Sequence, residues 1–540
     1  MESYKRLKMN NIRLDKAALL AGGAVVAAQG AAKAADEGAP AGEGRRPNIV
    51  IIMTDQQRAD LTAREGYPLD LTPFADSIAA QGCWFDRAYT PCPASGPARV
   101  SMLTGRFPKA TGTDSNHNIA DAFFYEDLFS TARKNGYLTA LVGKNHSHLK
   151  PEDADFWCPY NHLGQEKMKG HADTLSEGNR AFDRFLGRTD FYTSLEASPG
   201  DISNQIPYRM VSDALDWAGS HEDEPFVMWL SFPEPHNPYQ VCEPYFSMFE
   251  GKVPPALTDA SDLAAKGEKF LQLNEMMKLG HKGYDRNLER LRTTYMGMIR
   301  MLDDQMRRFV EGMQDLGLYE NTVFVITADH GDYAGEYGLM KKGAGVPDAI
   351  TRIPMVWFGK DIEAAGLRGD HVSLVDIYPT ACELMGCEIP LGVQGRSLAE
   401  MLAGRDYPGE EFRSIMTEAG FGGQYITKED MSDYQAEGAV GRKGLFFDEL
   451  NTWSQSGTIA MVRMGRYKLV YDMLGNGELY DLEKDPSEMR NLYGSRKYGK
   501  IKESLLEELL KWEIATEDPI PVPRNRYRFK RFEHNYLFTE

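Results

Sequence analysis

The sequence predicts an α/β protein in which a large layered domain is followed by a smaller antiparallel subdomain. Four continuous apolar runs, rich in β-branched residues, are typical of strands that are buried on both faces of a parallel sheet. They lie at residues 48–53, 138–142, 226–230 and 323–326. Residues 288–314 repeat apolar side chains at helical spacing, so we expect a long helix whose methionines pack in the core.

Towards the carboxyl end the pattern changes from long apolar runs to short strands. Three strands are expected to begin at residues 459, 467 and 478, and the last ends before Pro486, because a proline cannot donate to a β-ladder. A helix over residues 498–514 is expected to pack on this sheet. We therefore expect a main domain over residues 46–410 and a subdomain over residues 411–540.

The first 45 residues have the composition of an export signal and a linker. Basic residues precede an apolar stretch from Ala17 to Ala28, and Ala32-Lys-Ala34 is typical of a cleavage site. The apolar stretch is too short for a membrane anchor. We expect a signal peptide at residues 1–34, a Gly-, Ala- and Glu-rich linker at residues 35–45, and a periplasmic or secreted protein. A disordered Ala- and Gly-rich leader is the alternative interpretation.

The overall charge argues against nucleic acid as a partner. The chain has 540 residues, with 61 Lys and Arg against 79 Asp and Glu, and a net charge of −18. Nucleic-acid binding requires a basic face instead. Six cysteines are too few for a dense disulfide framework, and Cys382 and Cys387 could either pair or pack.

Polar residues follow each of the four predicted buried strands. They are Asp55 and Gln56, then Lys144 and His146, then His236, and finally Asp329 and His330. In an open α/β sheet, ligands bind outside the carboxyl ends of the strands. The four strand ends therefore predict one shared site.

A fifth segment carries the resemblance to a known family. Ser95-Gly-Pro-Ala-Arg99, followed by Leu103-Thr-Gly-Arg106, resembles the signature of the type I sulfatases of the alkaline phosphatase superfamily. In that family the first residue, Cys or Ser, is oxidised to formylglycine. Cys92 lacks the proline and arginine at the required spacing, so the register selects Ser95. Without the resemblance, Ser95 would be read as a helix cap.

The resemblance implies an alkaline-phosphatase-like α/β/α sandwich with a divalent metal. The metal ligands would be Asp55, Gln56, residue 95, Asp329 and His330, a shell of mainly oxygen donors that favours Ca²⁺, with Mn²⁺ as the alternative because of the imidazole. The commoner family pattern is Asp-Asp and Asp-Asn. The Asp-Gln and Asp-His pairs of this chain are similar to those of certain choline sulfatases and phosphonate monoester hydrolases.

The resemblance also assigns the groups that would activate and hold the nucleophile. Asp329 would accept a proton from the attacking hydroxyl, and Arg99 would hold the formylglycine and its neighbours through charge-assisted hydrogen bonds. His146 would remove the proton of the second hydroxyl so that sulfate is expelled. By spacing alone His148 could be this base, and only the family register selects His146.

Three further residues would act on the sulfate and on the departing alcohol. Lys144 and Lys342 would neutralise charge on the sulfate oxygens, and His236 would donate a proton to the leaving group. Alignment on Gly338-Leu339 favours Lys342 for the second lysine, although a slip of one residue would select Lys341.

These features predict an exported sulfatase that hydrolyses sulfate esters of carbohydrates, such as glycosaminoglycan or mucin-type fragments. Ser-type signatures are matured by radical-SAM enzymes typical of anaerobic bacteria, so we expect such a maturase as a partner. A phosphonate monoester hydrolase or phosphodiesterase is the first alternative. The second is a non-catalytic glycan-binding protein in which Ser95 stays serine.

Three other segments have open interpretations. Residues 245–285 lack a strong period and are interpreted as an inserted loop or helical hairpin over the site. Asn116-His-Asn118 could contact sugar hydroxyls or form a turn, and the basic, aromatic stretch at residues 524–532 could line the cleft or pack on the body.

Overall fold

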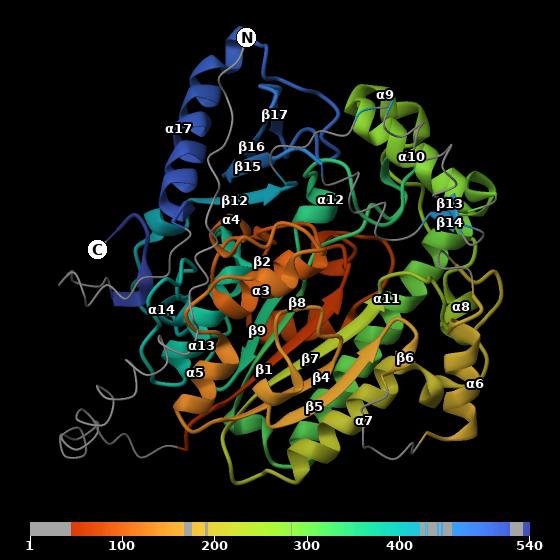
Figure 1. Ribbon diagram of the computed structural model, residues 1–540, viewed down its shortest axis with the longest axis vertical. Coiled ribbons are helices and arrows are strands. Elements are labelled where there is room, and N and C mark those ends of the chain that lie inside the picture. Colours follow the sequence, from red (N-terminus) through yellow and green to blue (C-terminus); the bar gives the residue numbers. More distant parts are fainter. Residues whose placement is uncertain are drawn as a thin grey trace, which may run out of the picture. The chain divides into compact units, whose positions relative to one another are not determined.

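A nine-stranded mixed sheet forms the centre of the computed structural model (Figure 1). Its strand order is β10-β2-β9-β8-β1-β7-β4-β5-β6. The strands are β1 (Asn48–Asp55), β2 (Cys83–Phe85), β4 (Leu138–Gly143), β5 (Phe156–Asn161), β6 (Gly164–Gln165), β7 (Phe226–Pro235), β8 (Thr322–Ala328), β9 (Met355–Gly359) and β10 (Gly366–Arg368). The five central strands, from β8 to β5, are parallel, and β9 joins β8 in the antiparallel sense.

The structure describes residues 45–166, 175–189, 193–281, 283–421, 456–518 and 533–539, with isolated residues between 427 and 445. The predicted signal peptide, nearly all of the predicted linker and the basic stretch at residues 524–532 lie outside these ranges. Residues 46–540 form one compact unit. In the described part of the chain no helix is long and apolar enough to cross a bilayer.

Helices cover both faces of the sheet. Successive side chains of β1 point in opposite directions, so both faces carry apolar side chains that pack against helices. Ile49, Ile51 and Met53 join an apolar cluster with one group of helices, and Val50 and Ile52 join a cluster with another. The first group is α3 (Ser95–Thr104), α5 (Leu128–Lys134) and α13 (Ile377–Leu384). The second is α2 (Pro73–Gln81), α7 (Ile206–Gly219) and the carboxyl half of α11 (Tyr284–Asp315). The expected α/β/α sandwich is therefore confirmed.

The predicted strands and the long helix are found with extended limits. The four apolar runs form β1, β4, β7 and β8, and β7 continues to Pro235, five residues beyond the predicted end. The helix expected over residues 288–314 is α11, and its Met298 and Met306 are buried in the core as expected. Residues 245–285 contain α8 (Tyr245–Met248), α9 (Leu263–Lys266) and α10 (Glu268–Gly280), so the helical alternative holds for most of this insertion.

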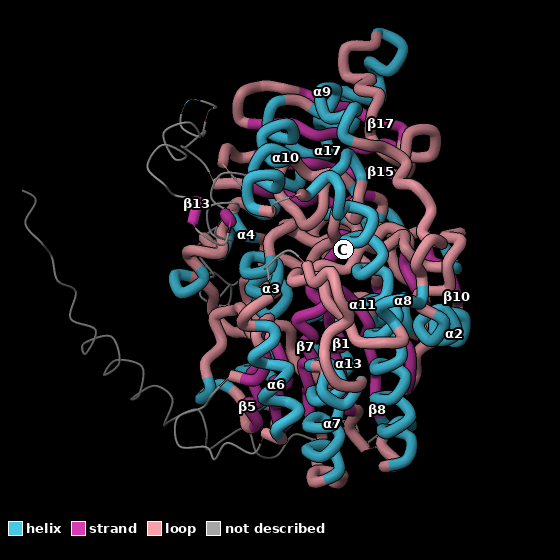
Figure 2. Tube along the Cα trace, turned by 90° about the vertical axis from the view of Figure 1, so that its right-hand side faces the viewer, coloured by secondary structure: helices cyan, strands magenta, loops and turns pink. Residues whose placement is uncertain are grey.

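A four-stranded antiparallel sheet with a helix forms the carboxyl-terminal part (Figure 2). Its strands are β12 (Ser414–Ala419), β15 (Ile459–Met464), β16 (Tyr467–Asp472) and β17 (Gly477–Asp481), and the helix is α17 (Gly499–Thr516). β12 was not expected from the sequence. Leu505 and Trp512 of α17 pack in one apolar cluster with Val462 and Leu469 of the sheet.

The cysteines form no disulfide in the structure, which describes all six of them. The thiol of Cys387 donates to the carbonyl oxygen of Cys382 at 3.3 Å. Of the two alternatives left open by the sequence, these residues therefore pack and do not pair.

Trp512 tests whether α17 is an integral part of the fold. The side chain is 1% exposed and its Nε1 donates to Ser414 Oγ at 2.9 Å. We expect Trp512→Ala to lower the free energy of unfolding by about 3–5 kcal/mol, because it opens a cavity and leaves a hydroxyl without its donor. Urea denaturation followed by circular dichroism measures this loss.

Leu510 of the same helix, which is 60% exposed, provides the matched control. Leu510→Ala should change the free energy of unfolding by no more than about 0.5 kcal/mol. Equal losses in the two variants would contradict the proposed role of the tryptophan.

Candidate active site

The carboxyl ends of four neighbouring parallel strands bring the predicted site residues to one edge of the sheet. Asp55 is the last residue of β1, and Asp329 comes directly after β8, its neighbour. Lys144 follows β4 and His236 follows β7, which lies between β1 and β4. All four residues are buried. The fold thus assembles the shared site that the strand ends predict.

Asp55 and Asp329, together with His330, form a cluster suited to a metal ion (the metal cluster). Ligand atoms of Asp55, Asp329 and His330 all lie within 4.8 Å of one another, and the three side chains are buried. His330 Nδ1 is 2.9 Å from the carbonyl oxygen of Gly331, which can only accept, so Nδ1 carries a proton. The lone pair on Nε2 therefore faces the carboxylates. Burial lowers the pKa of this imidazole to about 4, which keeps it in the neutral form that binds metals.

Ser95 opens α3 and points at this cluster. Its Oγ lies 2.9 Å from His330 Nε2 and 3.4 Å from Asp55 Oδ1. The N-cap residue is Ala94, and no side chain caps this helix. Ser95 is therefore not a capping residue, and the alternative interpretation of this position as a helix cap is wrong.

Two neighbours of Ser95 are also placed by the structure. Asn116 Oδ1 accepts from the backbone N–H of Gly96 at 2.9 Å, so this segment lies against the residue that follows Ser95 and is more than a surface turn. Cys92 is buried, and burial raises the pKa of its thiol, which disfavours the reactive thiolate.

Gln56 joins the metal cluster to a second layer of polar groups. Its backbone N–H donates to Asp329 Oδ1 at 3.0 Å, and its Nε2 donates to Asp332 Oδ2 at 2.7 Å. Its side-chain oxygen accepts from Lys342 Nζ at 3.1 Å. The residue is held at φ 67°, a strained conformation for a non-glycine residue. The orientation of the Gln56 side-chain amide is thus fixed by Asp332 at its nitrogen and by Lys342 at its oxygen.

Arg99 neutralises the two buried carboxylates. Its Nε donates to Asp329 Oδ2 at 2.9 Å, and its Nη2 lies 3.5 Å from Asp55 Oδ2. Its Nη1 donates to Ser231 Oγ and to the carbonyl oxygen of Lys144. These contacts place the guanidinium behind the metal cluster, where it orients the carboxylates.

The two lysines contact different members of the site. Lys144 Nζ contacts Asp55 Oδ2 and lies 3.1 Å from His162 Nε2, while Lys342 Nζ donates to Gln56. Burial lowers the pKa of Lys342 to about 8. At Lys341 the backbone N–H bonds to Asp332 Oδ1, whereas at Lys342 the side chain donates to Gln56.

The structure also distinguishes His146 from His148. His148 Nε2 lies 3.0 Å from Asp127 Oδ2, and its ring packs on Phe124 with 4.3 Å between centroids. His148 is therefore occupied by structural contacts. Burial, together with the charge of Lys144, lowers the pKa of His146 well below its usual value, so this ring is neutral.

His236 has a defined tautomer in its neutral form. Its Nδ1 lies 2.7 Å from the carbonyl oxygen of Asn237, so Nδ1 donates and Nε2 is the nitrogen that can exchange a proton with a ligand. The ring of His162 stacks on it, with 4.1 Å between centroids and 22° between planes.

Sequence reasoning missed His162 and the role of Asp332. His162 follows β5, which contains Pro159 and was not expected as a strand, although β5 runs parallel to β4 and ends at the same edge. Asp332 lies two residues after His330, and the sequence assigns it no role. It accepts from Gln56 Nε2 and from Tyr239 Oη at 2.6 Å, and burial raises its pKa to about 6.

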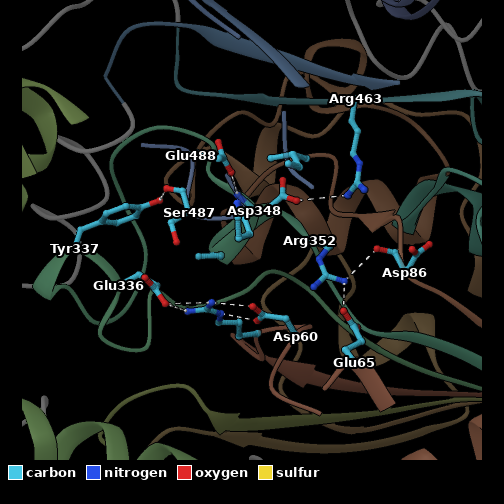
Figure 3. Close-up of a pocket in the computed structure, with 14 residues that line it drawn as sticks. Asp60, Glu65, Asp86, Glu336, Tyr337, Asp348, Arg352, Arg463, Ser487 and Glu488 are labelled. Carbon is cyan, nitrogen blue, oxygen red and sulfur yellow. Dashed lines mark hydrogen bonds and ion pairs between the residues drawn. The ribbon is translucent and has the colours of Figure 1, made fainter. Parts of the chain in front are cut away.

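A separate recess of about 220 Å³ lies between the main domain and the carboxyl-terminal sheet (Figure 3). Its lining in the described part of the chain includes none of the predicted catalytic or metal-binding side chains. Arg58 pairs with Asp60 there, and Arg463 of β15 lies 3.5 Å from Asp348. Two lining residues, Asp348 and Glu488, are also contacted by the buried ammonium of Lys468, at 2.8 Å and 3.0 Å.

Comparison with known proteins decides the family. The family model described as Sulfatase matches residues 47–387, and a second, described as N-sulphoglucosamine sulphohydrolase, C-terminal, matches residues 445–515. The chain belongs to the sulfatase family. It is a sulfuric ester hydrolase, and the family implies a metal ion and a formylglycine. The resemblance identified in the sequence is thereby confirmed at the level of the family.

Relatives of this sulfatase match over most of its length. An arylsulfatase of Clostridium perfringens is 26% identical, over 86% of this chain and 94% of its own. An N-acetylglucosamine-6-O-sulfatase of Bacteroides thetaiotaomicron is 24% identical, over 90% of each chain. The crystal structure of a phosphonate monoester hydrolase of Agrobacterium radiobacter superposes with a TM-score of 0.68 at 22% identity, over 90% of this chain and 98% of that one.

The pKa of Lys342 leads to a prediction for the pH dependence of catalysis. The ammonium loses its proton as the pH rises through about 8, so kcat/KM for 4-nitrophenyl sulfate should fall above that pH, by about tenfold per unit. A guanidinium stays charged at these pH values. Lys342→Arg should therefore lower the overall rate but keep the alkaline side of the profile flat.

Lys341→Arg is the matched control and should leave the alkaline decline in place. If Lys341→Arg removes the decline and Lys342→Arg does not, the register of the second lysine is wrong by one residue.

Proposed function

We propose that this protein is an exported sulfatase that hydrolyses sulfate esters of carbohydrates through a formylglycine made from Ser95. The observation that carries the proposal is the position of Ser95, with its Oγ 2.9 Å from His330 in a buried carboxylate and imidazole cluster. Relatives named N-acetylglucosamine-6-O-sulfatase and delta 4,5-hexuronate-2-O-sulfatase support a sulfated sugar as substrate. A glycosaminoglycan or mucin-type fragment fits this chemistry.

The proposal includes the organisation and maturation of the chain. A signal peptide at residues 1–34 and a linker at residues 35–45 would precede the catalytic domain at 46–410 and the subdomain at 411–540. Export would place the enzyme in the periplasm or outside the cell. A radical-SAM maturase would oxidise Ser95, as expected for an anaerobic bacterium.

Formylglycine and a divalent cation would supply the chemistry that serine lacks. A hydrated aldehyde carries two hydroxyls, one to attack sulfur and one whose deprotonation releases sulfate, and a cation lowers the pKa of the attacking hydroxyl. Asp55, Gln56, Asp329 and His330 would hold the cation next to residue 95. Their three oxygen donors and one imidazole favour Ca²⁺ and permit Mn²⁺.

The remaining residues of the site would hold the substrate and move protons. Lys144 and Lys342 would bind the sulfate oxygens, and Asp329 would accept the proton of the attacking hydroxyl. His236 would protonate the departing sugar oxygen through Nε2, after this nitrogen has first taken up a proton, because the neutral ring holds its own proton on Nδ1 against the backbone. His146, whose ring is neutral, would take the proton of the second hydroxyl.

One observation favours a second activity, the hydrolysis of phosphonate monoesters or phosphodiesters. The pairs Asp55-Gln56 and Asp329-His330 depart from the commoner sulfatase pattern, and a phosphonate monoester hydrolase shares the fold. The two lysines and the histidines around buried carboxylates argue against the other alternative, a non-catalytic glycan-binding protein. A binding protein has little need of such a set of ionisable groups.

The conversion of Ser95 tests the proposal directly. Protein co-expressed with an anaerobic maturase should show a loss of two hydrogens in the tryptic peptide that contains residue 95, measured by mass spectrometry. This protein should hydrolyse 4-nitrophenyl sulfate faster than an aryl phosphodiester. Ser95→Ala should lower kcat/KM at least about a thousandfold because it removes the nucleophile.

Ser95→Cys is the matched control, since the family signature accepts either residue, and co-expression with a maturase for cysteine-type sulfatases should preserve activity. An unmodified Ser95 combined with faster turnover of phosphodiesters would replace the sulfatase proposal by the second activity.

Metal removal gives an independent test of the donor set. Dialysis against EDTA should abolish turnover and lower the thermal unfolding midpoint, because a ligand at a hundred times its Kd stabilises the folded state by about 2.7 kcal/mol. Ca²⁺ should restore both. His330→Asn supplies an oxygen donor instead of an imidazole and should shift the preference further from Mn²⁺ towards Ca²⁺. Full activity after EDTA treatment would contradict a metal-dependent mechanism.

A further inference from the structure

His162 lies where two proposed catalytic groups meet, although no sequence pattern assigns it a role. It occupies the two-residue turn between β5 and β6, whose flanking pairs are Tyr160 with Gln165 and Asn161 with Gly164. The turn is well anchored, because β5 pairs with β4 and Tyr160 Oη donates to Asp213 Oδ2 at 2.6 Å. His162 is therefore presented to the site by rigid elements.

The first contact of His162 is with Lys144. The ammonium has three N–H donors and no acceptor, so the His162 Nε2 at 3.1 Å must accept, and the neutral ring then carries its proton on Nδ1. A second donor of Lys144 is used by Asp55 Oδ2. Because two of its three N–H bonds point at these acceptors, the direction of the third N–H of Lys144 is also fixed. This third N–H can donate to a sulfate oxygen.

The second contact is with His236. The two rings stack at 4.1 Å between centroids, which covers one face of the His236 imidazole. Because His236 Nδ1 is bonded to the Asn237 carbonyl oxygen, stacking and hydrogen bond together fix the direction in which Nε2 points. One side chain thus constrains both the sulfate-binding lysine and the donor to the leaving group.

We propose that His162 is a positioning residue, which holds the Lys144 ammonium through Nε2 and the His236 ring through its face. The proposal rests on the proposed function for the roles of Lys144 and His236. It explains how a flexible lysine stem can keep one orientation in a site where a displacement of about 1 Å can cost a hundredfold in rate.

The two contacts can be removed one at a time. His162→Gln keeps an acceptor within reach of Lys144 but removes the ring from His236. His162→Phe keeps a ring against His236 but removes the acceptor, and His162→Ala removes both. Each variant is prepared with the maturase and compared with wild type by thermal unfolding, mass spectrometry of residue 95, and kcat and KM for 4-nitrophenyl sulfate and phenyl sulfate.

The two substrates separate the effects because phenolate is the poorer leaving group and depends more on a proton from His236. For His162→Phe we expect KM to rise about tenfold for both substrates, with an unchanged ratio of their kcat values. For His162→Gln we expect a nearly normal KM and a kcat for phenyl sulfate that falls about tenfold more than for 4-nitrophenyl sulfate. His162→Ala should show both defects.

Calorimetric titration with inorganic sulfate provides a readout that needs no turnover. His162→Phe should weaken sulfate binding about tenfold, while His162→Gln should bind it as wild type does. If wild type binds sulfate but hydrolyses no sulfate ester, the proposed function fails, and the titration still tests the hold on Lys144.

Equal losses in the Gln and Phe variants with both substrates would show a merely structural residue and overturn the proposal. So would unchanged kinetics and sulfate binding in all three variants. His221 is the matched control, because it also stacks on an aromatic ring, that of Trp217, but lies outside the site. His221→Gln and His221→Phe should leave kcat, KM and sulfate binding unchanged.

Discussion

The site depends on the neutralisation of two carboxylates that the fold buries at neighbouring strand ends. Unpaired carboxylates in such a position would cost several kcal/mol each in lost hydration. Arg99 lies against both Asp55 and Asp329, and Lys144 contacts Asp55 from the other side. Although burial alone raises the pKa of Asp55, the charges of Lys144 and Arg99 hold it well below its ordinary value. Each charged group is therefore tolerated because the others are present.

This balance of charges also determines where Ser95, the proposed nucleophile, lies. Ser95 and Arg99 are four residues apart on α3 and so share one face of the helix. When the guanidinium binds the carboxylates, the first turn of α3 is fixed, and residue 95 is brought to the metal cluster. The four-residue spacing within the signature therefore has a structural reason. It places Arg99, which binds the carboxylates, one helical turn after residue 95.

The central strands and their polar ends could be predicted because doubly buried parallel strands produce continuous apolar runs. The other strands could not, since β2, β9 and β10 are short and β5 is interrupted by Pro159. His162 was missed for the same reason, because a residue in a hairpin turn has no sequence signal when the strand before it is not recognised. The family register alone selected His146 over His148, and the contacts of His148 with Asp127 and Phe124, which only the folded chain reveals, support that choice.

The buried ammonium of Lys468 joins parts of the chain that are distant in sequence. It belongs to β16 and contacts Asp348, at the start of the short helix α12 (Asp348–Thr351), and Glu488, which follows β17. Asp348 lies six residues after Lys342. A chimera that joined this catalytic domain to the carboxyl-terminal sheet of a relative would have to keep all three charges. The two parts of the gene are thus constrained to evolve together, even though the carboxyl-terminal sheet supplies none of the catalytic groups proposed here.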